Sequence, residues 1–142
     1  MDKIEIDGYK SIKHLELTLR PINILIGANG SGKSNFLSFF EFLKNIYSRN
    51  LQGYVALNGN MDKYLYGGRK VTDEMSAHMH FCSDGYSFTL KAAEEGFVFV
   101  KEGLWYSGNP HLSNPVDIAN YGTESRLSSD TMPRSTYIKN YL

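Results

Sequence analysis

The sequence has a single cysteine, Cys82, so an intramolecular disulfide is excluded. It also lacks an excess of either charge, because 15 Lys and Arg residues balance 15 Asp and Glu residues. A global basic field of the kind that drives non-specific nucleic-acid binding is therefore excluded, and any DNA contact would be local. No apolar run approaches the roughly 20 residues that cross a bilayer, and the N-terminal residues alternate charge with isoleucine, unlike a signal peptide. These features predict a cytoplasmic protein without a membrane span.

Period-two alternation of apolar and polar residues predicts an antiparallel pair of strands at residues 3–9 and 14–19. Residues 22–26, INILI, are continuously apolar, which is typical of a strand covered on both faces in the parallel core of an α/β sheet. Three further strands, separated by the turn signals DG and EEG, predict a β-meander over residues 76–83, 86–93 and 96–107. We therefore expect a mixed sheet.

Apolar residues recur at three- and four-residue spacing from about Lys33 to Arg49, which predicts a helix with one apolar face. That face carries Phe36, Phe39, Phe40, Leu43, Ile46 and Tyr47. Residues 51–69 are rich in Gly, Asn and Tyr and show no sustained period, so we expect a long loop there, with a short helix at most.

Residues 27–34, GANGSGKS, fit the pattern G-x-x-x-x-G-K-[ST] between a predicted strand and a predicted helix. A backbone that wraps around a polyphosphate needs positive φ angles or close approach at glycine positions, here Gly27, Gly30 and Gly32. The helix that follows adds a dipole whose positive end favours an anion. The pattern predicts a phosphate-binding loop, the Walker A motif. A glycine-rich turn that binds nothing would not explain the Lys and Ser after the last glycine.

The side chains of this loop have distinct expected roles. Lys33 is placed to bind the β- and γ-phosphates, and the Ser34 hydroxyl to complete the coordination of Mg²⁺. Asn29 and Ser31 lie along the inner edge of the loop. The predicted cofactors are therefore ATP and Mg²⁺.

Residues 6–43, IDGYKSIKHLELTLRPINILIGANGSGKSNFLSFFEFL, resemble the opening of RecF- and SMC-like ABC-type ATPases, most closely a bacterial AAA-family ATPase group. The shared loop is G-x-N-G-S-G-K-S-N, which includes Asn35. The resemblance implies an α/β P-loop NTPase fold, here an ABC-type N-terminal lobe. It also places Lys10 and Ser11 beside the nucleotide, as candidate contacts with phosphate or base. The family's role lies in DNA transactions or defence against foreign DNA.

This resemblance is densest over residues 3–45 and divides the chain into two parts. Residues 1–107 would form the nucleotide-binding lobe with the glycine loop, the main helix and the meander. Residues 108–142, dominated by Ser, Asn, Gly and Pro, would be irregular, with a helix near 116–122 or 135–142.

Three motifs that such ATPases use for hydrolysis are not recognisable, so whether this chain is an enzyme stays open. FVFV at residues 97–100 resembles a Walker B strand but is followed by Lys101, a cation where a Mg²⁺-linked aspartate belongs. LSSD at residues 127–130 lacks the glycine pair of a signature motif, and Gln52 follows the first helix too soon for a Q-loop. We expect nucleotide binding with very slow hydrolysis, no assignable catalytic residue, and a second ATPase lobe or subunit as a candidate partner.

Two other functions remain open. The chain could be a truncated lobe that acts as an interaction module by docking to a complete ATPase. It could also be a small self-sufficient NTPase or kinase, which would need a catalytic carboxylate from Asp62, Asp73 or Asp84.

Two residue groups offer weaker alternatives. His78, His80 and Cys82 alternate along a predicted strand and could present zinc ligands, but three ligands along one extended strand cannot close a tetrahedron without a bend. The tyrosines of residues 51–69 could stack on an adenine or pack the loop onto the helix; they are Tyr54, Tyr64 and Tyr66.

Overall fold

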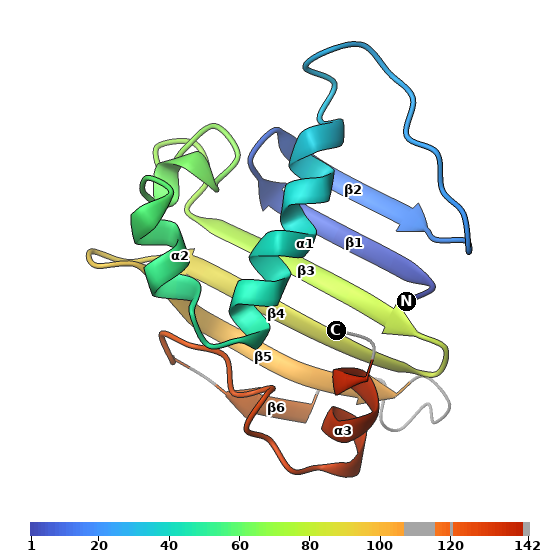
Figure 1. The fold of residues 1–142 in the computed structure, drawn as a ribbon. Coiled ribbons are helices and arrows are strands. Elements are labelled where there is room, and N and C mark those ends of the chain that lie inside the picture. Colours follow the sequence, from blue (N-terminus) through green and yellow to red (C-terminus); the bar gives the residue numbers. More distant parts are fainter. Residues whose placement is uncertain (107–115, 120, 141–142) are drawn as a thin grey trace.

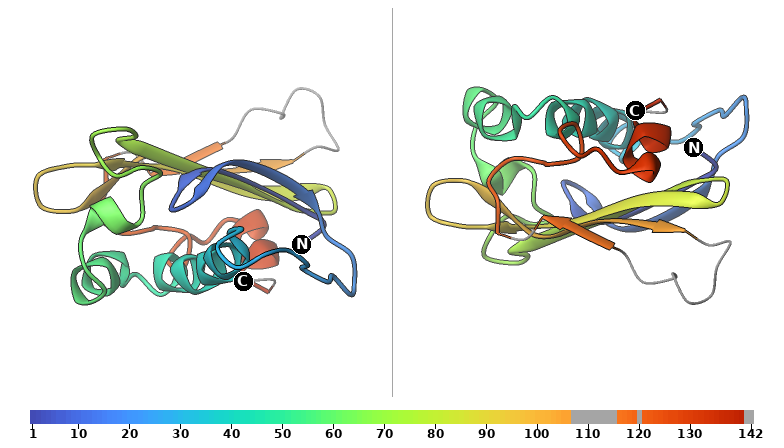
Figure 2. Two further views of the ribbon diagram at one scale, coloured as in Figure 1. Left: turned by 90° about the horizontal axis from the view of Figure 1, so that it is seen from above. Right: turned by 90° about the horizontal axis from the view of Figure 1, so that it is seen from below.

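The computed structural model describes residues 1–106, 116–119 and 121–140, which form an α/β fold of two layers (Figures 1 and 2). One layer is a six-stranded sheet with the order β2-β1-β3-β4-β5-β6, in which every neighbouring pair is antiparallel. The other layer holds the helices, all on one face of the sheet (Figure 2). The strands are β1 (Lys3–Tyr9), β2 (Ile12–Thr18), β3 (Glu74–Phe81), β4 (Asp84–Ala92), β5 (Phe97–Tyr106) and β6 (Val116–Ala119). The helices are α1 (Lys33–Tyr47), α2 (Leu51–Leu57), the 3₁₀ turn η1 (Met61–Lys63) and α3 (Pro133–Lys139).

The predicted N-terminal hairpin and the predicted meander are both present, and they belong to one sheet. Alternation along β1 places Ile4 and Ile6 in the core, fully buried beneath the helices. The second neighbour of β1 is β3, where Lys3 lies opposite His80. This pairing joins the first 18 residues to the meander across more than 50 intervening residues, including α1.

The prediction of a central parallel strand at residues 22–26 is wrong. These residues form no strand, and Ile22, Ile24 and Ile26 are 81%, 77% and 88% exposed. The chain between β2 and α1 runs outside the sheet (Figure 1). A strand needs hydrogen-bonding partners along its backbone, and within the described ranges no strand pairs with this segment. The predicted parallel core of a mixed sheet is therefore replaced by an all-antiparallel sheet.

Helix α1 begins at Lys33 as predicted and ends at Tyr47, two residues before the predicted end. Its buried face differs from the predicted one at three positions, because Phe42 is fully buried, Phe40 lies at the exposed edge and Tyr47 is only partly buried. The buried residues are Phe36, Phe39, Phe42, Leu43 and Ile46. The ring of Phe42 contacts Tyr9 of β1 at 5.4 Å and Phe97 of β5 at 6.4 Å between centroids, so α1 crosses several strands.

Residues 51–69 contain α2 and η1, and their tyrosines differ in role. Tyr54 and Tyr64 pack against Phe42, with centroid separations of 6.4 and 5.4 Å. These contacts favour packing of the loop on the helix over adenine stacking for both residues. Tyr66 instead lines a hollow on the opposite face of the sheet, with Asp7 and Lys13.

The C-terminal segment contributes to the fold in ways that its composition did not indicate. A helix near residues 116–122 is not found, because Val116–Ala119 form strand β6 beside β5. The alternative helix, near residues 135–142, corresponds to α3, which begins with Pro133 and contacts β4. Leu127 and Ile138 are fully buried in the core. The predicted boundary between residues 107 and 108 lies outside the described residues.

Two carboxylates tie the C-terminal segment to the rest of the molecule. Glu102 of β5 is fully buried and accepts hydrogen bonds from the Tyr86 hydroxyl at 2.6 Å, the Ser125 hydroxyl, and the Arg126 backbone N–H at 2.9 Å. Glu124 accepts from two backbone N–H groups at the start of α2, each at 3.0 Å. These hydrogen bonds join the C-terminal segment to the sheet through Glu102 and to the helical layer through the start of α2.

No helix in the described ranges is both long enough and apolar enough to cross a membrane.

Replacing Glu102 with Gln should lower the free energy of unfolding by about 1–3 kcal/mol. Both carboxylate oxygens of Glu102 accept hydrogen bonds, and an amide has only one oxygen that can accept. The midpoint of urea unfolding measures this change. Glu95→Gln, at an exposed position beyond β4, is the control and should stay within about 0.5 kcal/mol of the native chain. Equal stability of both variants would contradict a structural role for the Glu102 network.

Candidate functional site

The glycine loop, residues 27–34, connects the exposed run 22–26 to α1. Gly30 and Gly32 have φ angles of 83° and 94°, in the left-handed region that favours glycine, and Gly32 is the N-cap of α1. Gly27 meets the second requirement, close approach, since a Cβ there would lie 2.8 Å from the Ser31 Oγ. Gly30 and Gly32 thus have a backbone reason to be glycine, whereas at Gly27 a Cβ would crowd the Ser31 side chain.

The ammonium group of Lys33 lies inside this loop. It donates hydrogen bonds to the carbonyl oxygens of Gly27 at 2.6 Å and Ala28 at 2.7 Å, and to the Ser31 Oγ at 3.1 Å. These acceptors are neutral. A charged phosphate oxygen forms a stronger bond with an ammonium group than a carbonyl does, so an anion at the loop would compete for Lys33.

A hollow of about 380 Å³ lies at this point and is lined by residues 29–35. The side chains predicted to bind a nucleotide converge there; they are Asn29, Ser31, Lys33, Ser34 and Asn35. The first hydrogen bond of α1 runs from the Phe36 N–H to the Gly32 carbonyl at 2.9 Å. The N–H groups before Phe36 belong to the helix N-terminus, whose partial positive charge favours an anion.

The β1–β2 turn, residues 9–12, lies beside the glycine loop. The Ser11 Oγ accepts a hydrogen bond from the Asn35 Nδ2 at 2.7 Å, and a Cβ on Gly32 would approach the same oxygen to 3.2 Å. Ser11 also lines a groove of about 330 Å³ together with Gly27 and Lys33. The structure therefore brings Ser11 to the loop.

Lys10 points away from the glycine loop, toward the sheet side of α1. Its ammonium donates to the Ser38 Oγ at 2.8 Å and lies 5.3 Å from the ring centroids of both Tyr9 and Tyr64. It lines neither the hollow nor the groove at the loop. Burial among these groups lowers the pKa of Lys10, and the negative charge of Glu41 partly opposes this shift.

The carboxylates that a self-sufficient NTPase would need have other neighbours. Asp62 accepts from the backbone N–H of Arg69 at 2.9 Å and from its guanidinium at 3.2 Å. Asp73 forms an ion pair with Lys91 at 3.3 Å. Neither these two nor Asp84 is among the residues lining the hollow and groove at the glycine loop.

The segments compared with hydrolytic motifs have structural roles. Residues 97–100 lie in β5, with Phe97 and Phe99 fully buried, which is the meander strand expected from their alternation. The Gln52 side chain clamps the start of β5, donating to the Phe97 carbonyl at 2.8 Å and accepting from the Phe97 N–H at 3.2 Å. Sequence patterns could not show this contact, because the two residues lie 45 positions apart.

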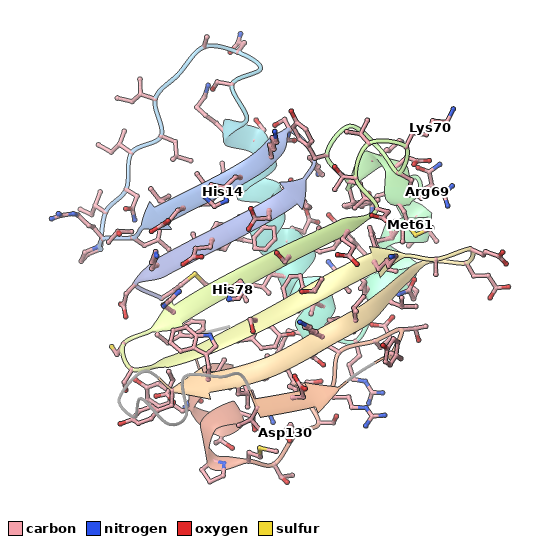
Figure 3. All side chains as sticks on the ribbon, turned by 180° about the vertical axis from the view of Figure 1, so that it is seen from behind. His14, Met61, Arg69, Lys70, His78 and Asp130 are labelled. Atoms are coloured by element: carbon pink, nitrogen blue, oxygen red, sulfur yellow. The ribbon has the colours of Figure 1, made fainter. Side chains whose placement is uncertain are left out.

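The face of the sheet opposite α1 is polar and carries His14 and His78 (Figure 3). Strand β3 ends at Phe81, so Cys82 lies in the following turn with a φ of 55° and does not continue the row of His78 and His80. No group of three His, Cys, Asp or Glu residues that could hold a metal ion occurs in the part of the chain that the structure describes. The zinc alternative has no structural support.

A glycine loop that ends at the N-terminus of a helix packed on a sheet is the arrangement of P-loop nucleotide-binding proteins. The chain belongs to the AAA ATPase domain family, which it matches over residues 1–118. A curated relative is the tungstate uptake system ATP-binding protein TupC of Campylobacter jejuni, 52% identical over 57 residues. That match covers 39% of this chain and 17% of the relative's length. Together the two matches identify an N-terminal region of an ABC/AAA-type P-loop ATPase and support nucleotide binding.

The pKa of Lys10 should lie below 10.5, the ordinary value for lysine, because burial disfavours its charged form. Since the folded pKa lies below the unfolded one, the contribution of Lys10 to stability should rise as pH increases through the folded pKa. NMR titration of the Lys10 side chain measures the value. Glu41→Gln should lower it further, by removing the opposing negative charge. A pKa at or above 10.5 would contradict the partial burial of the ammonium.

Proposed function

We propose that the chain binds ATP with Mg²⁺ through the glycine loop, acting as a Walker A motif. The observation that carries this proposal is the hollow at the start of α1, lined by residues 29–35, which include the lysine and serine that follow the last glycine. Membership of the AAA ATPase domain family supports the choice of ATP among phosphate-containing ligands.

The residues at the loop suit a polyphosphate. Gly27, Gly30 and Gly32 carry no side chain, and a backbone without side chains can come close to a phosphate. Lys33 would exchange its carbonyl partners for the β- and γ-phosphate oxygens, and the Ser34 hydroxyl would be a ligand of Mg²⁺. The metal ion, when bound, neutralises charge on the phosphates. Asn29 and Ser31 would bind along the inner edge.

We further propose that the chain belongs to the RecF- and SMC-like branch, with a role in DNA transactions or defence, and that hydrolysis requires a second ATPase lobe or subunit. The sequence resemblance over residues 3–45 supports the branch. The relative TupC is named for tungstate uptake, but its match covers 17% of its length. That extent supports a shared ATP-binding region and carries no transported substrate to this chain.

A second candidate function is docking to a complete ATPase. The exposure of Ile22, Ile24 and Ile26 favours it, because contiguous exposed apolar residues mark interaction surfaces. In this case nucleotide binding by the isolated chain would be weak or absent.

Mg·ATP should raise the melting temperature of the chain, and Lys33→Ala should abolish the rise. A ligand at 100 times its Kd stabilises the folded state by about 2.7 kcal/mol, which corresponds to several degrees for about 150 residues. Differential scanning fluorimetry with and without millimolar Mg·ATP measures the shift. Lys44→Ala, an exposed lysine in the last turn of the same helix, is the control and should retain the full shift. No shift in the native chain would refute ATP binding and leave docking as the leading function.

Removing the Ser34 hydroxyl should weaken the Mg²⁺-dependent part of ATP binding. We expect Ser34→Ala to bind ATP in EDTA as the native chain does, but to gain less affinity when Mg²⁺ is added. Isothermal titration calorimetry under both conditions measures the difference. Ser34→Thr keeps a hydroxyl and should restore the Mg²⁺ effect. If Ser34→Ala responds to Mg²⁺ as strongly as the native chain, the metal-ligand role is wrong.

A further inference from the structure

The β1–β2 turn is connected to the first turns of α1 by two hydrogen-bonded paths. In the first, the Asn35 side chain donates to the Ser11 Oγ at 2.7 Å. In the second, Ser38 bonds both Lys10 at 2.8 Å and the Tyr9 hydroxyl at 3.1 Å, and its own hydroxyl donates to the Asn35 carbonyl at 2.9 Å. The side chain of Asn35 and its backbone are therefore both tied to the turn, one by each path.

The turn is itself held in place. Lys10 has a φ of 49°, in the left-handed region, and its backbone N–H donates to the Tyr64 carbonyl at 2.9 Å. The Gly8 carbonyl accepts from the Tyr66 N–H at 2.9 Å. Tyr9, between Gly8 and Lys10, is fully buried in the core. A surface residue at this turn, such as Ser11, thus sits on a backbone that packing and hydrogen bonds fix.

We propose that Ser11 is a positioning residue, which orients the Asn35 side chain at the glycine loop and so raises the affinity for Mg·ATP. This inference rests on the proposed function. Asn35 lines the hollow at the loop, and the bond to Ser11 orders its side chain before a ligand arrives. A pre-ordered side chain loses less freedom on binding, and the affinity is correspondingly higher. Ser11 acts through Asn35 and does not itself bind the nucleotide.

Affinity measurements on four variants test this role. The Kd for Mg·ATP is measured by isothermal titration calorimetry for the native chain, Ser11→Ala, Asn35→Ala, the double variant and Ser11→Thr. One hydrogen bond corresponds to a loss of about three- to tenfold, which we expect for Ser11→Ala. Ser11→Thr keeps the hydroxyl acceptor and should bind as the native chain does.

The double variant separates positioning from direct contact. If Ser11 acts through Asn35, then Ser11→Ala should weaken binding no further once Asn35 is Ala. If Ser11 contacts the nucleotide itself, the same three- to tenfold loss should appear in the Asn35→Ala background, and the proposal is overturned. Failure of Ser11→Thr to restore binding would also overturn it.

Two further measurements serve as controls: the melting temperature of each variant without nucleotide, and the Kd of the native chain. Ser11 is exposed, so the melting temperature of nucleotide-free Ser11→Ala should equal that of Ser48→Ala, the same change at the exposed C-cap of α1. Ser48→Ala should also keep the native Kd. If Ser11→Ala binds Mg·ATP with the native Kd, the positioning role is overturned and the proposed function stays intact. If the native chain does not bind Mg·ATP, the proposed function is refuted and this inference with it.

Discussion

The packing of α1 against β1 is the constraint on which the rest of the structure depends, and it is concentrated at Tyr9. The ring of Tyr9 is fully buried between Phe39 and Phe42, at centroid distances of 5.2 and 5.4 Å, and its hydroxyl lies 3.1 Å from Ser38. Aromatic contacts of this kind set the rotation of a helix as well as its height above the sheet. Because the glycine loop ends where α1 begins, the contacts of Tyr9 also determine where that loop lies.

A single helix therefore links the core to the candidate site. Its apolar side buries phenylalanines against β1 and β5, while its first turn presents Lys33, Ser34 and Asn35 beside the β1–β2 turn. The site residues come from two segments, the turn and the loop with the start of α1, and the bonded pair Ser11 and Asn35 lies 24 positions apart. These residues offer one positive charge, on Lys33, and several hydrogen-bonding groups. The residues that line the hollow include no carboxylate that could orient a water molecule. The chemistry suits phosphate binding more than phosphate transfer.

Sequence patterns were most reliable where a local period or a local motif decides the structure. The alternation in residues 3–9 and in the meander, the start of α1 at Lys33, and the family were all predicted correctly. The largely apolar run 22–26 was misassigned, because hydrophobicity shows that a segment would favour burial but not which strand is there to pair with it. Strand β6 was missed for a related reason, since four residues show too short a pattern to separate strand from helix.

The sequence by itself determined the glycine loop and its attachment to α1, because the spacing of glycines, lysine and serine is a local requirement of a backbone that curls at a helix N-terminus. Only the tertiary structure decided that Ser11 reaches Asn35 while the neighbouring Lys10 turns toward Tyr64. These contacts depend on the sheet order and on the rotation of α1, which are set by burial among residues far apart in the chain. A pattern read along the sequence carries no information about such distances.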